Sequence, residues 1–184
     1  EPAEVDTGYQ TEYLSDLIND MNSGDVKSLV ILGGNPLYHA PANSGFSEAF
    51  SKVEFRAHLT SHINETSRQC QWQVAESHYL EAWGDLRAFD GTVTIVQPLI
   101  QPLYKTVSRI EILAFIAGKV GLTGLELVRE HWELHSLKAN FATFWRKTLH
   151  DGVMEGTAFD KISPSPKKIR IPDKFGELLE EDVI

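Results

Sequence analysis

The chain has 184 residues, of which 42% are hydrophobic and 23% are charged, and its net charge is −9 at pH 7. This composition is typical of a globular protein with a hydrophobic core, and it excludes a wholly disordered or low-complexity chain. The acidic balance argues against nucleic-acid binding, because that function needs clustered positive charge.

The lengths of the apolar runs, the number of cysteines and the first residues of the chain indicate whether to expect a membrane span, a disulfide or a targeting signal. No apolar run approaches the roughly 18–20 residues that a transmembrane helix needs, so we expect no direct membrane span. The single cysteine, Cys70, cannot form an intramolecular disulfide or hold an iron–sulfur cluster, and we expect a buried structural thiol. The chain begins at Glu1 without a basic and then apolar segment, which predicts no signal peptide and indicates a processed chain or a fragment.

The first half of the chain alternates helical and strand patterns. Helices are predicted over residues 9–22, 44–51 and 64–70, the last with Asn64 as its N-cap. Strands are predicted over residues 28–32, 53–59 and 72–75. Because strands that alternate with helices form βαβ units, these three strands are expected to be parallel neighbours in one sheet.

The second half is predicted to be mainly helical. A β-branched run at residues 92–97 follows a turn and precedes Pro98 and Pro102, which favour an extended, irregular stretch. Helical patterns then cover residues 107–119, 122–137 and 141–149. The predicted fold class is α/β, a three-layer doubly wound and mainly parallel sheet with an added C-terminal helical segment. The expected organisation is an α/β domain over residues 1–119, a helical extension over 120–159 and a linker or tail over 160–184.

The tetrapeptide Gly33-Gly34-Asn35-Pro36 follows the first predicted strand. Open α/β sheets bind ligands in the crevice outside the carboxyl ends of their strands, and glycines allow the backbone to approach a ligand closely. The alternative is a plain turn, in which Gly33 or Gly34 has a positive φ and Asn35 caps the next turn. The loop matches neither of the glycine-rich phosphate-binding patterns.

No complete catalytic or metal-binding set is recognisable in the sequence. His131 and His135 share a helical face, but zinc needs further ligands, so solvated side chains are the simpler interpretation. His58 and His62 span the end of a predicted strand and would lie about 13 Å apart, too far for one metal. We therefore expect no stoichiometric iron, molybdenum or zinc and name no catalytic residue.

The order of the motifs resembles the molybdopterin oxidoreductase family, to which dimethyl sulfoxide reductase belongs. The resemblance runs through roughly residues 28–118 and rests on four segments: Leu-Val-Ile-Leu-Gly-Gly-Asn-Pro at 29–36, Asn-Glu-Thr-Ser at 64–67, the aromatic, Glu and Gly segment at 79–85, and the strand with spaced prolines at 89–104. In that family the GxNP loop lies beside a pterin dinucleotide. The resemblance thus implies candidate cofactor-binding residues at Gly33, Gly34, Asn35 and Pro36.

Residues 78–85 and 144–152 are most similar to one branch, the large iron–sulfur subunit of alternative complex III, a quinol:electron-acceptor oxidoreductase. This resemblance implies a vestigial pterin site without molybdenum, and iron–sulfur clusters elsewhere in the full subunit. It further implies a fragment of a respiratory subunit that is structural and non-catalytic in isolation. Its partners would be the rest of its subunit and the other subunits, which would hold it at the membrane on the bacterial periplasmic side.

Two other functions stay open. The first alternative is a part of an active enzyme that binds molybdopterin guanine dinucleotide, although residues 33–51 contain no Lys or Arg to contact its phosphates. A stand-alone α/β domain that binds a small molecule is the second alternative, and a deep pocket over Asn35 would favour it.

Overall fold

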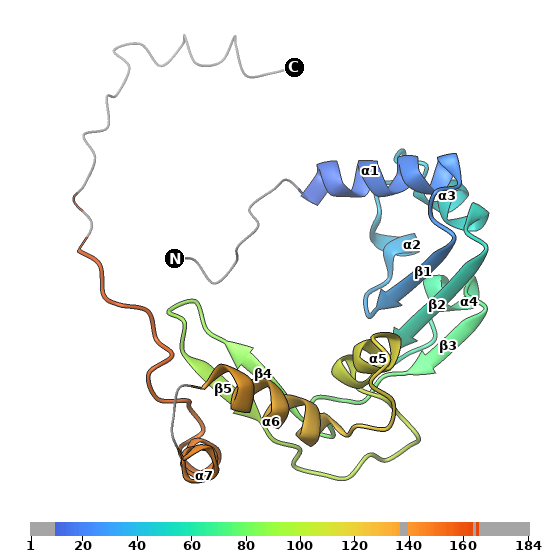
Figure 1. Ribbon diagram of the computed structural model, residues 1–184. Helices are drawn as coiled ribbons and strands as arrows, with labels where there is room; N and C mark the ends of the chain where they lie inside the picture. Colours follow the sequence, from blue (N-terminus) through green and yellow to red (C-terminus); the bar gives the residue numbers. More distant parts are fainter. Residues whose placement is uncertain (1–9, 137–139, 164, 166–184) are drawn as a thin grey trace.

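The structure, a computed structural model, describes residues 10–136, 140–163 and 165 (Figure 1). Its elements in chain order are α1 (Gln10–Ser23), β1 (Ser28–Leu32), α2 (Pro36–His39), α3 (Phe46–Lys52), β2 (Phe55–Thr60), α4 (Glu65–Arg68), β3 (Trp72–Ala75), β4 (Gly84–Arg87), β5 (Val93–Val96), α5 (Arg109–Ile116), α6 (Gly124–His135) and α7 (Phe141–Asp151). None of the helices in the described ranges is long and apolar enough to cross a membrane.

The parallel sheet predicted from the alternating pattern is confirmed. Its order is β1-β2-β3, and both pairs of strands are parallel. The backbone N–H of Val107 donates to the carbonyl of Ala75, which adds one parallel bridge beyond β3. The expected α/β fold with helices and a C-terminal helical segment is therefore present.

A hydrophobic core joins the parallel sheet to the helices that precede and connect its strands. Buried side chains of α1 and α3 meet Leu29 and Ile31 of β1, and side chains of α2 and Cys70 pack at the margin. The fully buried members of this core include Phe50 and Ala49 of α3. The apolar residues that recur at helical spacing on α1 therefore pack against β1 in this core.

The predicted strand at residues 92–97 does not join the parallel sheet. It forms β5, which pairs antiparallel with β4 in a separate two-stranded sheet. Figure 1 shows this hairpin beside α6, apart from β1–β3. Its buried residues Val93 and Ile95 share a second core with α6 and α7, built around Trp132 and Trp145.

Local capping signals explain where several helices begin. Asn64, Ser108 and Thr123 each accept a hydrogen bond from the backbone three residues later and complete a capping box. The predicted N-cap at Asn64 is confirmed. Helix α2 was not predicted from the sequence. In the expected tail, residues 160–163 and 165 form no regular element, and the other residues of the tail lie outside the described ranges.

Candidate functional site

The Gly33–Pro36 loop lies where the strand pattern predicts, at the carboxyl edge of the parallel sheet. The N–H of Gly33 donates to the carbonyl of Leu59 on β2 at 2.8 Å, which anchors the loop to the neighbouring strand. Gly33 and Gly34 have φ angles of 79° and 75°, so both use the left-handed region that favours glycine. The predicted positive φ is confirmed at both positions.

Asn35 connects two elements instead of capping the turn that follows it. It stands at the N-cap of α2, but its side chain makes no capping hydrogen bond there. Its amide nitrogen donates to the carboxylate of Glu65 at 2.6 Å, and its amide oxygen accepts from the hydroxyl of Thr66 at 2.8 Å. The expected turn-capping role is therefore corrected to a link across thirty residues to α4.

A second bond closes this link from the other side. The amide of Asn64 donates to the carbonyl of Gly34 at 3.3 Å. The hydrogen bond from Asn35 lowers the pKa of the Glu65 carboxyl, so this group stays negatively charged beside the loop. The loop after β1 and the first turn of α4 thus form one hydrogen-bonded unit, which we call the loop clasp (Gly34, Asn35, Asn64, Glu65 and Thr66).

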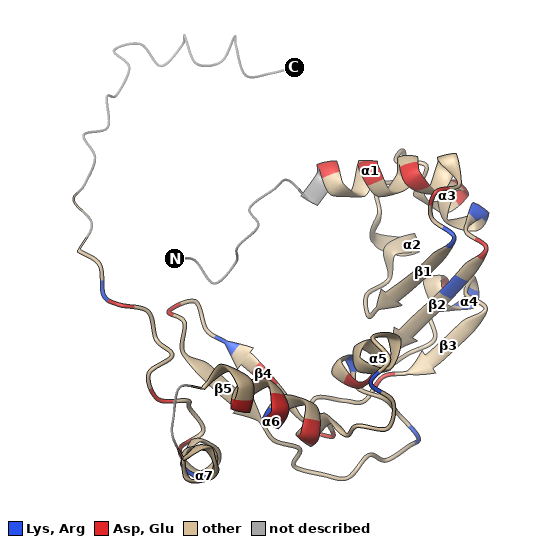
Figure 2. Cartoon of the chain, viewed as in Figure 1, with Lys and Arg blue, Asp and Glu red and all other residues tan. Residues whose placement is uncertain are grey.

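An ion pair lies against the other side of the loop. The guanidinium of Arg109, the first residue of α5, donates to the carboxylate of Glu76 just after β3. A side chain added at Gly33 would place its Cβ 2.6 Å from this guanidinium. Figure 2 shows basic and acidic positions together at the start of α5, where the ion pair lies. Because Gly33 has no side chain, the guanidinium of Arg109 can lie directly against the loop.

His58 is completely buried behind the loop. It lies in the central strand β2, and neither ring nitrogen has a hydrogen-bond partner among the described residues. Burial lowers the pKa of His58, while the backbone of Gly33 and Gly34 and the charge of Glu76 partly oppose that shift. The sequence does not predict this burial. In residues 53–59 the apolar side chains Val53, Phe55, Ala57 and Leu59 alternate with polar ones, and this pattern places His58 on the opposite, polar face.

A cavity lies beside the ion pair, and no residue of the Gly33–Pro36 loop lines it. It has a volume of about 510 Å³ and is bounded by residues 76–79, 82–86 and 108–110, together with Ser61 and Val96. Asn35 does not line it. A deep pocket over Asn35 would favour a stand-alone binding domain. This cavity is not such a pocket, because it lies away from Asn35.

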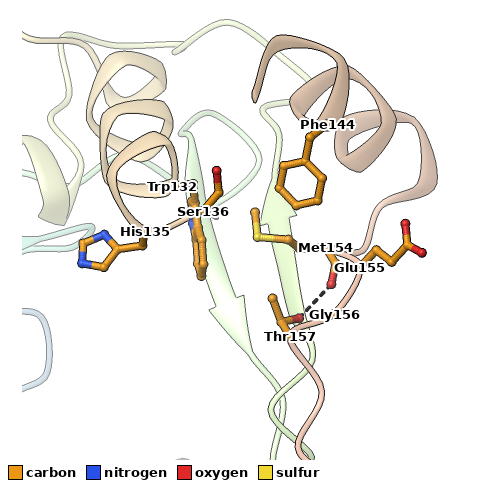
Figure 3. Close-up of a pocket in the computed structure, with 8 residues that line it drawn as sticks. All are labelled: Trp132, His135, Ser136, Phe144, Met154, Glu155, Gly156 and Thr157. Atoms are coloured by element: carbon orange, nitrogen blue, oxygen red, sulfur yellow. Dashed lines mark hydrogen bonds between the residues drawn. The ribbon is translucent and has the colours of Figure 1, made fainter. Parts of the chain in front are cut away.

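A smaller cavity of about 280 Å³ belongs to the second core (Figure 3). Its walls are Trp132 of α6, Phe144 of α7 and Met154, and Thr157 at its margin donates to the carbonyl of Met154. The lining also includes the polar side chains of His135, Ser136 and Glu155, and no residue of the Gly33–Pro36 loop is part of it.

Most polar side chains around the loop are paired within the protein. Both polar groups of the Asn35 side chain bond within the protein, and the nearby cation, Arg109, is paired with Glu76. Glu65 adds a negative charge on the other side. Of the two loop glycines, Gly34 borders open space, because a Cβ added there would meet no atom within 4 Å.

No metal site emerges from the described residues, where no three His, Cys, Asp or Glu side chains are grouped to hold an ion. The rings of His131 and His135 stack on the exposed side of α6, with centroids 4.3 Å apart. Cys70 is half-buried, and burial raises the pKa of its thiol. Neither motif gains a catalytic or ligand-binding partner from the fold.

Two curated proteins share part of this sequence. The menaquinone reductase, molybdopterin-binding-like subunit of Nitratidesulfovibrio vulgaris is 31% identical over 137 residues, which are 72% of this chain and 19% of that protein. The arsenate respiratory reductase molybdopterin-containing subunit ArrA of Shewanella sp. (strain ANA-3) is 29% identical over 114 residues, which are 59% of this chain and 13% of that protein.

The chain therefore spans less than one fifth of the length of either relative. No family model matches it. One relative is named as a molybdopterin-binding-like subunit and the other as a molybdopterin-containing subunit, in agreement with the resemblance carried by the loop and strand motifs. The similarity supports the molybdopterin oxidoreductase family for this chain.

Proposed function

We propose that the chain is the α/β part of a molybdopterin oxidoreductase-family subunit in a respiratory, quinol-oxidising electron-transfer complex, and that it is structural and non-catalytic by itself. The observation that carries this proposal is the loop clasp. The side chain of Asn35 is bonded to Glu65 and Thr66, so the family's cofactor-side loop holds its shape through protein contacts. A loop held in this way needs no ligand to be ordered.

The comparison with a quinone-linked protein adds support. One relative is a menaquinone reductase subunit whose name describes it as molybdopterin-binding-like. A domain that keeps the family's sheet and loop while its polar groups bond internally agrees with that description. The branch that we propose is the large iron–sulfur subunit of alternative complex III, with clusters elsewhere in the polypeptide and membrane attachment through partner subunits at the periplasmic face.

A second function has its own support. ArrA is named as a molybdopterin-containing subunit, and the backbone of Gly34 faces open space. In an active enzyme of this kind a pterin dinucleotide would approach the loop at Gly34, where no side chain obstructs the backbone. The chain would then be part of the cofactor site and not a relic of it.

Purification from the native membrane separates these functions. A tag is placed on the chromosomal gene, and the protein is extracted with mild detergent. The mass of the polypeptide, its molybdenum and iron contents and its quinol oxidation are then measured. We expect a longer polypeptide that copurifies with other subunits, oxidises quinol and contains iron, with molybdenum far below one atom per polypeptide.

Two results would contradict the proposal. Molybdenum at one atom per polypeptide would establish the active enzyme instead. A polypeptide of this length alone, without partner subunits or quinol oxidation, would establish a stand-alone domain. The untagged strain, carried through the same purification, controls for metal and quinol activity from other membrane proteins.

A further inference from the structure

Strand β1 has the sequence of an internal strand but lies at the end of the sheet. In the order β1-β2-β3 it has one neighbour, and its sequence Ser-Leu-Val-Ile-Leu is uncharged and apolar on both faces. Edge strands in natural proteins are commonly protected by charges, prolines or bulges. Continuous apolar runs are typical of parallel strands that are paired on both sides and covered on both faces.

The backbone on the outer edge of β1 can be assigned from its hydrogen bonds to β2. The carbonyl of Lys27 accepts from Phe55, and the N–H of Gly33 donates to Leu59. Because backbone groups alternate sides along a strand, the N–H and C=O groups of Ser28, Val30 and Leu32 point away from β2. No strand in the described ranges pairs with this edge.

One face of the sheet is covered by the helices of this chain. Leu29 and Ile31 pack against the core that α1, α2 and α3 build. On the same face, the guanidinium of Arg56 lies over the ring of Phe50, 5.2 Å from its centroid. The side chain of Gln73 on β3 likewise donates to the carbonyl of Ser67 on α4.

The opposite face carries exposed apolar side chains. The register aligns Val30 with Ala57 and Ala57 with Trp72, and it sets Phe55 opposite Ser28, on the same face. Val30 and Phe55 are each 40% exposed, and Trp72 is 62% exposed. We call these residues, Val30, Phe55, Ala57 and Trp72, the open face. Figure 1 shows α5 only beside the carboxyl ends of the strands.

The handedness of parallel connections explains why the described helices that connect β1, β2 and β3 lie on one face of the sheet. Crossovers between parallel strands are right-handed in almost all proteins, so successive steps in one direction place their helices on one face. The steps from β1 to β2 and from β2 to β3 run in the same direction. Helices on the other face require steps in the opposite direction, through strands that lie beyond the outer edge of β1.

We propose that further strand–helix units of the same polypeptide complete this sheet: a strand pairs with the outer edge of β1, and a crossover helix lays an apolar stripe on the open face. This rests on the proposed function, which requires a longer polypeptide. The chain spans 19% and 13% of its two relatives, so a polypeptide of their length would hold ample sequence for such units.

Pairing with a second copy of the chain would cover the outer edge of β1 but not the open face. Two copies that pair antiparallel through β1 about a two-fold axis perpendicular to the sheet would close both edges. That axis keeps both open faces on the same side, so Val30, Phe55 and Trp72 would stay exposed. Units from one polypeptide cover the edge and the face together.

Photo-crosslinking in the purified native complex tests this proposal. Trp72 is replaced by p-benzoylphenylalanine in the full polypeptide, the complex is irradiated, and crosslinked peptides are identified by mass spectrometry. We expect a crosslink to a segment of the same polypeptide outside these residues. The same replacement at Glu48, an exposed position on the helix-covered side, should give no such product. Replacement of Phe55 serves if the Trp72 variant does not assemble.

Residue-resolved hydrogen exchange on the same complex tests whether the outer edge of β1 is paired with another strand. The amides of Val30 and Leu32 should exchange as slowly as those of Leu29 and Ile31, which face β2. A crosslink to a second copy, distinguished by mixed isotope labelling, would overturn the proposal, as would a crosslink to another subunit or none at all. The polypeptide's mass, molybdenum content and quinol oxidation test the proposed function separately, because they do not depend on crosslinking.

Discussion

The amide oxygen of Asn35 accepts hydrogen bonds from both the backbone N–H and the hydroxyl of Thr66, which is fully buried. The same hydroxyl accepts from the N–H of Leu37 at 3.1 Å, so it connects α4 to α2 as well. One side chain therefore sets the position of the loop relative to two helices. This arrangement assigns Asn35 a structural task that can be measured directly.

Asn35→Ala should destabilise the protein by about 1–3 kcal/mol, because the buried hydroxyl of Thr66 loses its acceptor. Urea unfolding followed by circular dichroism measures this free energy. Asn43→Ala, at an exposed position, is the matched control and should change stability by less than about 0.5 kcal/mol. Equal effects of the two substitutions would show that the loop clasp contributes nothing.

Guanine nucleotides should not change the melting temperature of the parent protein or of Asn35→Ala, because the Asn35 side chain is already bonded to Glu65 and Thr66. Thermal melts of both proteins with and without a guanine nucleotide make this measurement. A nucleotide-dependent rise in the parent that disappears in the variant would assign Asn35 to a working cofactor site.

Substitutions at the two glycines should differ in their effects. A left-handed backbone costs a non-glycine residue roughly 1–2 kcal/mol, which applies to both Gly33→Ala and Gly34→Ala. Gly33→Ala should cost more, because its Cβ would displace the Arg109 guanidinium from the loop, whereas Gly34→Ala meets open space. Unfolding of both variants in the parent and Arg109→Ala backgrounds tests this. The extra cost at position 33 should vanish without Arg109.

Acidification should destabilise the fold through His58. Burial lowers the pKa of this residue from its ordinary value of 6.5, so the folded state favours the neutral ring. The resulting stability is present above the unfolded pKa and is lost as the pH falls through the lower folded value. Unfolding free energies measured from about pH 7 to about pH 5 should therefore decrease, above the range where carboxylates titrate.

The variant His58→Leu removes the titrating ring and should flatten this pH dependence. His62→Gln, which changes an exposed imidazole four residues along the chain, is the control substitution. A slope that persists in His58→Leu would assign the acid sensitivity to other groups.

The hairpin should depend on one partly buried hydrogen bond to α6. The indole N–H of Trp132 donates to the carboxylate of Asp85 on β4 at 2.6 Å, and Trp132 is part of the second core. Asp85→Ala leaves this donor without its acceptor and should cost about 1–3 kcal/mol. A double-mutant cycle with Trp132→Phe, read by urea unfolding, should recover a coupling energy. Strict additivity of the two substitutions would contradict the link.

Local sequence determined the elements whose signals are local. The apolar runs at 28–32 and 72–75 gave β1 and β3 with their predicted bounds, and the alternation of helices and strands predicted their parallel pairing. Asn64 was recognisable as an N-cap because capping involves residues three positions apart. The positive φ angles at Gly33 and Gly34 followed from glycine's lack of a Cβ.

Tertiary structure alone decided what depends on distant partners. The strand predicted at 92–97 pairs with Gly84–Arg87, a segment without a clear strand pattern, and the two form a separate antiparallel hairpin. His58 is buried because it lies beside Ile31 on the face of the sheet that the helices cover. Alternation along one strand cannot reveal which face the helices will cover. The partners of Asn35 and Arg109 lie thirty or more residues away, so only the folded chain brings these polar groups together.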